Sequence, residues 1–233
     1  MKKQLMKTYG ISMNITNNVV TEYINQFYEE TTYELKDLRK EAEENHVPII
    51  LRDTEKLLKS IVLLKKPIKI LEIGAAVGYS SSFFASINEQ IEVVTIEADE
   101  KTYNIAKGNI KKLGYEDRIT LLFGDAREVL IELSESHNDF DLVFIDAAKS
   151  HYKAFWDLSI PLVKDDALII CDNILMKGMT ASDEFDVKKK YKTSIRKMRD
   201  FLDYINNLDY ADTSTLSVGD GITISILNKR KGI

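Results

Sequence analysis

The feature that most constrains the fold is a regular alternation of short apolar runs and longer amphipathic stretches through the middle of the chain. The apolar runs have the length and the branched residues of buried strands, and the stretches between them carry helical periodicity. A strand, a helix and a further strand in this order usually form a parallel unit, so the pattern predicts an α/β fold with a doubly wound sheet. The expected strands cover 68–73, 91–96, 119–123, 142–145 and 167–171, and the expected helices cover 80–87, 100–113, 126–133 and 152–162.

The end of the chain departs from this alternation. A helix is expected over 193–207, and two strand-like runs, 213–218 and 222–227, then flank the turn Gly219-Asp220-Gly221. We therefore expect a seven-stranded, mostly parallel sheet that ends in an antiparallel hairpin. Such an ending is unusual for nucleotide-binding dehydrogenases, and it is the pattern of Rossmann-like class I methyltransferases.

The first third of the chain is predicted to be helical. Helices are expected from Asn17 or Asn18 to Glu30, from Tyr33 to Asn45, and onward from Asp53. In the last of these, the residues expected to face inward are Leu57, Leu58, Ile61, Val62 and Leu64. The chain of 233 residues suits one core, so we expect a single domain with a helical extension at 1–66 and an α/β core at 67–233.

Composition limits where the protein works and what it binds. No apolar run is long enough to cross a membrane, and no apolar signal core follows the basic N-terminus. The one cysteine, Cys171, lies in an expected buried strand and is interpreted as a core residue. The net charge of −5 argues against a general nucleic-acid coat, although it leaves room for a local basic patch. We expect a cytoplasmic protein with no membrane partner.

Two neighbouring expected strands end in oxygen-bearing side chains. Asp146 follows the run 142–145, and Asp172 and Asn173 follow the run 167–171. Ends of adjacent parallel strands lie roughly 5 Å apart, and open α/β sheets bind ligands at that edge. Each acid alone is better explained as a helix cap or a turn residue. The pair, with Lys149 close by in the sequence, favours a functional site.

A glycine loop follows the first expected strand. Gly74 and Gly78 bracket small residues that let a ligand approach the backbone, at a spacing that fits neither a dinucleotide fingerprint nor a P-loop. A tight turn alone would also use glycine. Glu97 ends the next strand and can accept both hydroxyls of a ribose. Asp125 can accept from an adenine amino group, and it fits a helix cap equally well.

Three stretches together resemble the metal-dependent class I O-methyltransferases, a family that includes catechol and caffeoyl-CoA methyltransferases. They are Leu71-Glu72-Ile73-Gly74 with Gly78-Tyr79-Ser80, Phe144 to Lys149, and Asp172-Asn173. The resemblance implies S-adenosylmethionine as methyl donor, a divalent ion that is usually magnesium, and a homodimer. By motif match, it assigns Asp146, Asp172 and Asn173 to the metal, Lys149 to the base, and Asp146, Gly74, Ser80, Glu97, Asp125 and Ala126 to the donor.

A narrower resemblance links the stretches 42–50, 172–178 and 183–200 to a bacterial branch that methylates 5-hydroxyuridine at the tRNA wobble position. In that branch the residue matching Ile50 contacts the methyl donor. Ala148 stands where catechol enzymes carry an aromatic residue. Our prediction is therefore a tRNA 5-hydroxyuridine O-methyltransferase acting in the anticodon region. The alternative is a small-molecule catechol or phenolic O-methyltransferase, and a non-catalytic binding module is disfavoured by the intact acid, amide and lysine set.

A basic segment, residues 188–199, supports the prediction that the substrate is tRNA. It has seven basic residues and no acid, which suggests a phosphate-rich partner. The alternative is an ordinary solvated helix face. The expected RNA contacts are Lys188, Lys189, Lys190 and Arg196. Tyr152 is expected to line the substrate entrance.

Overall fold

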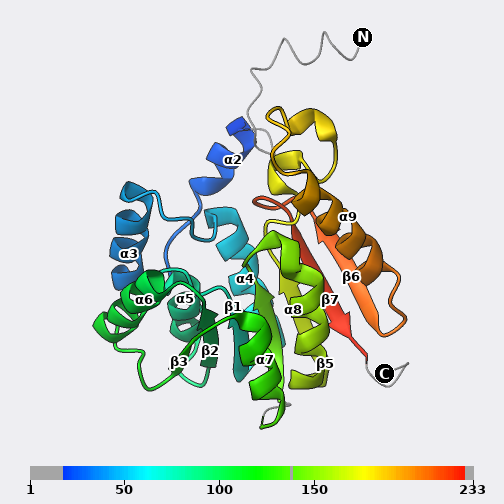
Figure 1. Cartoon of the computed structure of the whole chain (residues 1–233). Helices are drawn as coiled ribbons and strands as arrows, with labels where there is room; N and C mark the ends of the chain where they lie inside the picture. Colours follow the sequence, from blue (N-terminus) through cyan, green and yellow to red (C-terminus); the bar gives the residue numbers. More distant parts are fainter. Residues whose placement is uncertain (1–17, 137–138, 229–233) are drawn as a thin grey trace.

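The computed structural model describes residues 18–136 and 139–228, so the first seventeen residues of the predicted extension lie outside it. Seven strands form one sheet in the order β3-β2-β1-β4-β5-β7-β6 (Figure 1). The strands are β1 (Lys69–Ile73), β2 (Glu92–Glu97), β3 (Ile119–Phe123), β4 (Phe140–Ile145), β5 (Val163–Cys171), β6 (Ala211–Leu216) and β7 (Ile222–Leu227). The first five are parallel, whereas β7 runs antiparallel to both β5 and β6. The predicted sheet and its terminal hairpin are confirmed.

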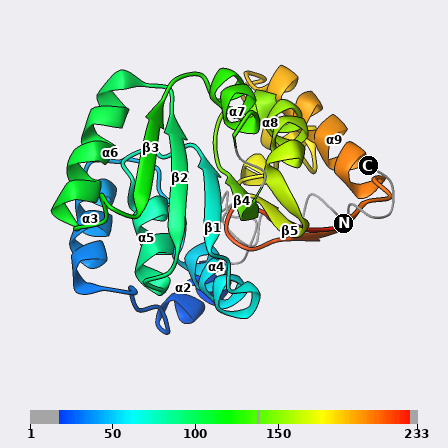
Figure 2. The ribbon, with the colours of Figure 1, turned by 90° about the horizontal axis from the view of Figure 1, so that it is seen from below.

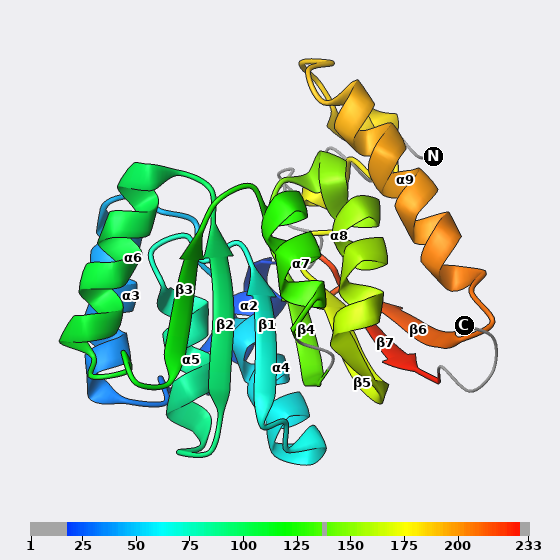
Figure 3. The same cartoon turned by 60° about the horizontal axis from the view of Figure 1, so that its bottom comes forward.

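Helices cover both faces of this sheet, as Figure 2 shows from below. One face carries α7 (Ala126–Ser134), α8 (Tyr152–Ser159) and α9 (Lys192–Asn206), and the last lies over the β6–β7 edge (Figure 3). The other face carries α4 (Arg52–Lys65), α5 (Tyr79–Ile87) and α6 (Glu100–Lys112), with α3 (Tyr33–Glu44) packed against α5. The strand residues alternate between the two cores: Leu71 and Val143 face one, and Ile70 and Leu142 face the other. Both faces are buried, which explains the unbroken apolar runs in the sequence.

The strand β5 starts four residues earlier than its apolar run indicates. Its first half contains Lys164, Asp165 and Asp166, which are partly or fully exposed, and a register irregularity against β4 occurs there. Hydrophobicity therefore detects only the part of this strand that enters the core. The other strand and helix boundaries in the α/β part lie within about three residues of those expected, which is the usual uncertainty of helix and strand ends.

The N-terminal helices differ more from expectation. Helix α2 spans only Asn18–Asn25, five residues short of its predicted end, and its apolar side chains Val19 and Ile24 are exposed. In α4, Leu58 and Val62 are buried as predicted, but Leu64 is 83% exposed. Leu64 lies two residues after Val62, about 200° around the helix, so the two side chains cannot face the same core. The helices α3 and α4 share one hydrophobic core with α5 and the sheet.

The carboxyl ends of the central strands form one continuous edge. Beyond the strands, the Asp146 amide donates to the Ile73 carbonyl and the Asp172 amide donates to the Ile145 carbonyl, each at 3.0 Å. The ladder therefore aligns the residues after β1, β4 and β5 before the chain turns away. Among the described residues, no helix is long and apolar enough to span a membrane.

Candidate active site

The side chains after β4 and β5 meet at this edge, as their positions in the sequence indicated. The Asn173 amide nitrogen lies 3.2 Å from Asp146 Oδ1, and the backbone amide of Asn173 donates to Asp172 Oδ1 at 2.7 Å. Asn173 takes a left-handed backbone with φ of 58°, which turns the chain sharply and returns its side chain toward Asp146. Two carboxylates and one amide thus converge from adjacent strands.

Lys149 completes the cluster. Its Nζ donates to Asp146 Oδ1 at 2.9 Å and to the Tyr152 hydroxyl at 3.0 Å. Tyr152 in turn donates to the Asp172 carbonyl at 2.7 Å. Tyr152 is 1% exposed, so the prediction that it lines the entrance is wrong: it is a buried brace between Lys149 and the β5 end. Burial raises the pKa of Tyr152, which keeps the phenol protonated and able to donate.

The negative charge of the two carboxylates in this cluster is only partly offset by positive charge nearby. Asp172 is 2% exposed, and burial together with the nearby Asp146 charge raises its pKa well above the usual range for a carboxyl. The Asn173 amide and Lys149 offset this only in part. No group of three or more histidine, cysteine or acidic side chains suited to a metal occurs in the part of the chain that the structure describes. The cluster is instead an oxygen set of two acids and one amide.

The glycine loop, Gly74–Gly78, passes directly against this cluster. Gly74 has φ of 104°, and a Cβ placed there would lie 2.3 Å from the Asp146 carbonyl oxygen. Only glycine permits both the conformation and the close approach. Glu97 anchors the loop from β2, because its carboxylate accepts from the Ala76 amide and from the Asp99 amide, each at 2.9 Å. The sequence did not predict these two hydrogen bonds.

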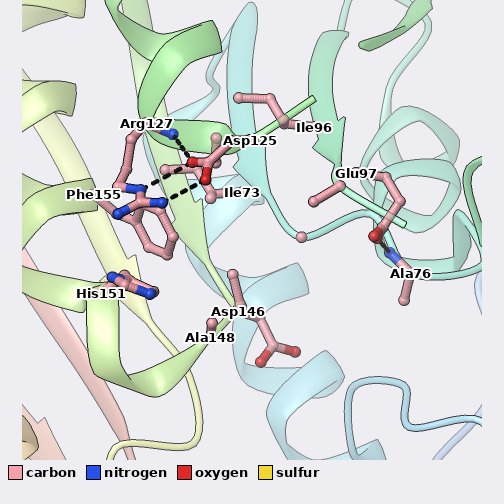
Figure 4. A pocket seen from close by; sticks show the side chains of 14 residues that line it. Ile73, Ala76, Ile96, Glu97, Asp125, Arg127, Asp146, Ala148, His151 and Phe155 are labelled. Atoms are coloured by element: carbon pink, nitrogen blue, oxygen red, sulfur yellow. Dashed lines mark hydrogen bonds and ion pairs between the residues drawn. The ribbon is translucent and has the colours of Figure 1, made fainter. Parts of the chain in front are cut away.

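A cavity of about 410 Å³ opens beside the loop, and we call it the Glu97 cavity. In Figure 4, Glu97 and Ala76 lie on one side of it, and Arg127, Phe155 and His151 lie on the other. Its lining also includes Ile73, Gly74, Ile96, Ala98, Asp125, Ala126, Asp146, Ala147 and Ala148. Ala148 therefore borders this cavity, and it does not line the separate cavity that begins at Lys149.

Asp125 serves as the helix cap that the sequence allowed. Its carboxylate accepts from the Arg127 amide at 2.9 Å and also pairs with the Arg127 guanidinium. These bonds hold the pKa of Asp125 at about 2. An adenine amino group would share this carboxylate with Arg127, a residue that the sequence patterns did not single out.

A second cavity, of about 340 Å³, lies on the other side of Gly74, and we call it the Ser80 cavity. It shares Gly74, Ala76, Asp146 and Ala147 with the Glu97 cavity. Its remaining lining residues are Pro48, Ile49, Ile50, Ala75, Tyr79, Ser80, Lys149 and Asn173. Gly74, Ser80 and Ile50, which were all predicted to contact the cofactor, thus border a single space.

A third cavity, of about 390 Å³, begins at Lys149 on the side away from the glycine loop, and we call it the Tyr191 cavity. Its walls are mainly apolar, and it is lined by Lys149, Met176, Lys177, Met179, Phe185, Asp186, Val187, Lys188, Tyr191 and Asp220. Lys149 is common to this cavity and the Ser80 cavity. The three spaces therefore follow one another, and Asp146 and Lys149 stand where they meet.

The basic segment borders the Tyr191 cavity. Lys188 lines it, and Lys189, Lys190 and Arg196 are exposed nearby in sequence. Buried Asp186 shapes the turn by accepting from the amides of Lys190 and Tyr191. Arg199 is not free for a partner, because it donates to the carbonyls of Met179 and Thr180 and pairs with Asp183.

Comparison with known proteins agrees with this architecture. Residues 25–229 match the model of the O-methyltransferase family. Caffeoyl-CoA O-methyltransferase from Stellaria longipes is 31% identical, over 94% of this chain and 97% of that enzyme. A Staphylococcus aureus structure provisionally named caffeoyl-CoA O-methyltransferase gives a TM-score of 0.85 at 32% identity, over 90% of this chain and all of the other. An O-methyltransferase from Bacillus cereus, solved with S-adenosylhomocysteine (SAH), gives a TM-score of 0.78 at 24% identity, over 90% and 97% of the two chains.

The fold and the open edge beside the glycine loop define a methyltransferase of the Rossmann-like class. More narrowly, the chain belongs to the O-methyltransferase family, and it is of the type represented by the caffeoyl-CoA enzymes.

Proposed function

We propose that this enzyme transfers a methyl group to a hydroxyl of a small catechol or related phenol, with the help of a divalent metal ion. The observation that carries the proposal is the Tyr191 cavity, whose apolar walls lead to Lys149 beside an oxygen cluster. Met176, Phe185 and Tyr191 suit an aromatic ring, and the polar end of the cavity suits its hydroxyls. The similarity to caffeoyl-CoA enzymes supports a phenolic acceptor.

The methyl donor is proposed to occupy the two other cavities. Its nucleoside would lie in the Glu97 cavity, where Glu97 takes the ribose hydroxyls and Asp125 and Ala126 border the adenine. Its amino-acid end would lie in the Ser80 cavity, against Gly74, Ser80 and Ile50. The sulfur would then lie near Asp146, where the two cavities join. This placement brings the reactive methyl toward Lys149 and the Tyr191 cavity.

The residues present fit a hard divalent cation. Asp146, Asp172 and Asn173 supply oxygen atoms, the ligand type that magnesium, calcium and manganese prefer over zinc. Burial and, after it, the nearby Asp146 carboxylate raise the pKa of Asp172, and the positive charge of Lys149 offsets this only in part. Bound magnesium would supply further positive charge and Lewis-acid stabilisation of an acceptor oxyanion.

Residues of this chain then accept the proton and align the acceptor with the methyl donor. Lys149, held by Asp146 and Tyr152, takes the proton from the acceptor hydroxyl when its side chain is in the neutral amine form. The apolar walls of the Tyr191 cavity orient the ring so that the hydroxyl oxygen attacks the methyl group in line with the sulfur. The Glu97 and Ser80 cavities fix the donor, so the three reacting atoms are aligned before the methyl group moves.

Acceptor preference tests this assignment. We expect the enzyme to methylate a compound with two adjacent ring hydroxyls at least about tenfold faster than the matched compound with one, because two oxygens can reach the cation together. Product formation is measured by mass spectrometry with excess donor and magnesium. Equal rates for both compounds, or turnover with tRNA only, would contradict the small-molecule assignment.

The basic segment favours a second candidate, methylation of 5-hydroxyuridine in tRNA. Lys188 lines the Tyr191 cavity, and Lys189, Lys190 and Arg196 are exposed further along the same segment, so all four could bind phosphates. The 5-hydroxyl and 4-carbonyl of that base would present a pair of oxygens as a catechol does. The two candidates are separated by analysing tRNA nucleosides from a deletion strain. Accumulated 5-hydroxyuridine with lost 5-methoxyuridine would establish the tRNA activity, whereas an unchanged profile would exclude it.

Homodimer formation also stays a proposal. Helix α2 exposes apolar side chains along its length, Val19, Val20, Tyr23 and Ile24, with Phe27 just beyond it. An exposed apolar stripe of this kind is compatible with an interface.

A further inference from the structure

A buried polar network lies behind the wall of the Ser80 cavity, and nothing in the proposed chemistry uses it. Arg39 on α3 and Glu55 on α4 are each 2% exposed and form a direct ion pair. The Tyr79 hydroxyl, at the start of α5, accepts from Arg39 Nε at 3.1 Å and donates to Glu55 at 2.8 Å. Tyr28 adds a fourth member, because its hydroxyl donates to the other oxygen of Glu55 at 2.8 Å.

Two members of this network connect to the cavity wall. Arg39 Nη1 donates to the Ile50 carbonyl at 3.1 Å, and Ile50 lines the Ser80 cavity. Tyr79 lines the same cavity and directly follows Gly78 of the glycine loop. One guanidinium therefore holds two separate wall segments, the 48–51 segment and the end of the glycine loop, in a fixed relation.

Stability alone does not require such a network. A buried ion pair is costly to desolvate, and well-packed apolar residues often stabilise a core equally well. Burial raises the pKa values of Tyr28 and Tyr79, so both phenols keep their protons and the network stays fully bonded. What apolar residues could not provide is the directed bond to the Ile50 carbonyl.

We propose that Arg39 is a positioning residue for the methyl donor: it holds Ile50 and Tyr79 at the spacing that the donor's amino-acid end requires. This inference rests on the proposed placement of the donor in the Ser80 cavity. It is independent of the acceptor.

The test uses the full chain and the variant Arg39→Lys. Lysine keeps the positive charge, but one ammonium cannot reach Glu55, Tyr79 and the Ile50 carbonyl with the geometry of a guanidinium. We expect the dissociation constant of SAH to rise about tenfold, since bonds from charged donors are among the stronger ones. The KM for the donor should rise similarly, while the KM for the acceptor stays unchanged.

A second variant separates positioning from folding. The pair Arg39→Met with Glu55→Met removes both charges together, and the hydroxyls of Tyr28 and Tyr79, 3.4 Å apart, can still bond to each other. This variant should fold and should bind SAH as weakly as Arg39→Lys. The matched control is Arg118→Lys, since Arg118 also donates to backbone carbonyls, those of Ala85 and Asn88, at the far end of α5.

Binding is measured by calorimetry well below the unfolding temperature of each variant. Loss of SAH affinity in both Arg39 variants, with wild-type affinity in Arg118→Lys, supports the inference. Wild-type affinity in either Arg39 variant, or an equal loss in the control, overturns it. Glu97→Ala reports on the donor placement itself: if that variant binds SAH normally, the placement has failed, whatever Arg39 does.

Discussion

Replacing Asp172 by alanine is expected to lower the turnover number at least about 10³-fold while leaving the protein folded. Asp172 lies at the end of β5, and the proposed cation depends on its carboxylate. Stabilisation of a developing oxyanion by a metal is worth several kcal/mol, and each 1.4 kcal/mol changes a rate tenfold. The midpoint of thermal unfolding should stay the same or rise, because the change removes a buried acid that faces another acid.

The matched control is Asp166→Ala, an identical change in the exposed half of the same strand. The Asp166 side chain is 80% exposed and pairs with Lys65 at the opposite end of the sheet. It should keep wild-type turnover. Steady-state kinetics and a thermal melt of both variants suffice, and near-normal turnover of Asp172→Ala would remove this acid from the catalytic site.

Replacing Gly74 by alanine is expected to weaken SAH binding at least about 100-fold. The new methyl group would collide with the Asp146 carbonyl, and the backbone at φ of 104° is strained for any other residue. Such strain costs about 1–3 kcal/mol, and relieving the collision must also move either the glycine loop or the Asp146 backbone. Both of these segments border the two proposed donor cavities. Calorimetric titration with SAH measures the effect directly.

Gly108→Ala is the control for this substitution. Gly108 lies within α6, and a Cβ there meets no atom within 4 Å. Alanine in a helix interior is better than glycine by about 0.5–1 kcal/mol, so this variant should be more stable and should bind SAH normally. A Gly74→Ala protein with wild-type affinity would show that the donor does not lie against this loop.

Most of the residues at the carboxyl edge of the sheet could be predicted from the sequence, because their positions depend only on the order of the strands and on where each strand ends. Asp146, Asp172 and Asn173 follow two apolar runs, and adjacent parallel strands necessarily bring such residues together. Lys149 was found for the same reason, since it lies only three residues beyond Asp146. The glycine loop and Glu97 follow from the spacing within the first two strand units.

Other parts of the site depend on tertiary packing, which no local sequence pattern predicts. In the sequence, Tyr152 is simply the first residue of a predicted helix. Only the fold shows that its hydroxyl bridges Lys149 and the Asp172 carbonyl. From the sequence alone, Arg39 would be expected to lie on the surface of a charged helix. In the fold it is buried and pairs with Glu55, which lies on a different helix. The Tyr191 cavity is lined by residues from four separate stretches, so its apolar character could not be inferred in advance.

The central claim is that one edge of the sheet brings the methyl donor, a divalent cation and a phenolic hydroxyl together around Asp146 and Lys149. The most direct test measures transfer of labelled methyl from S-adenosylmethionine to a catechol in enzyme treated with excess EDTA, and again after magnesium is restored. We expect methyl transfer to disappear and then to return, with SAH binding largely retained throughout. Full methyl transfer in the presence of excess EDTA would contradict the account.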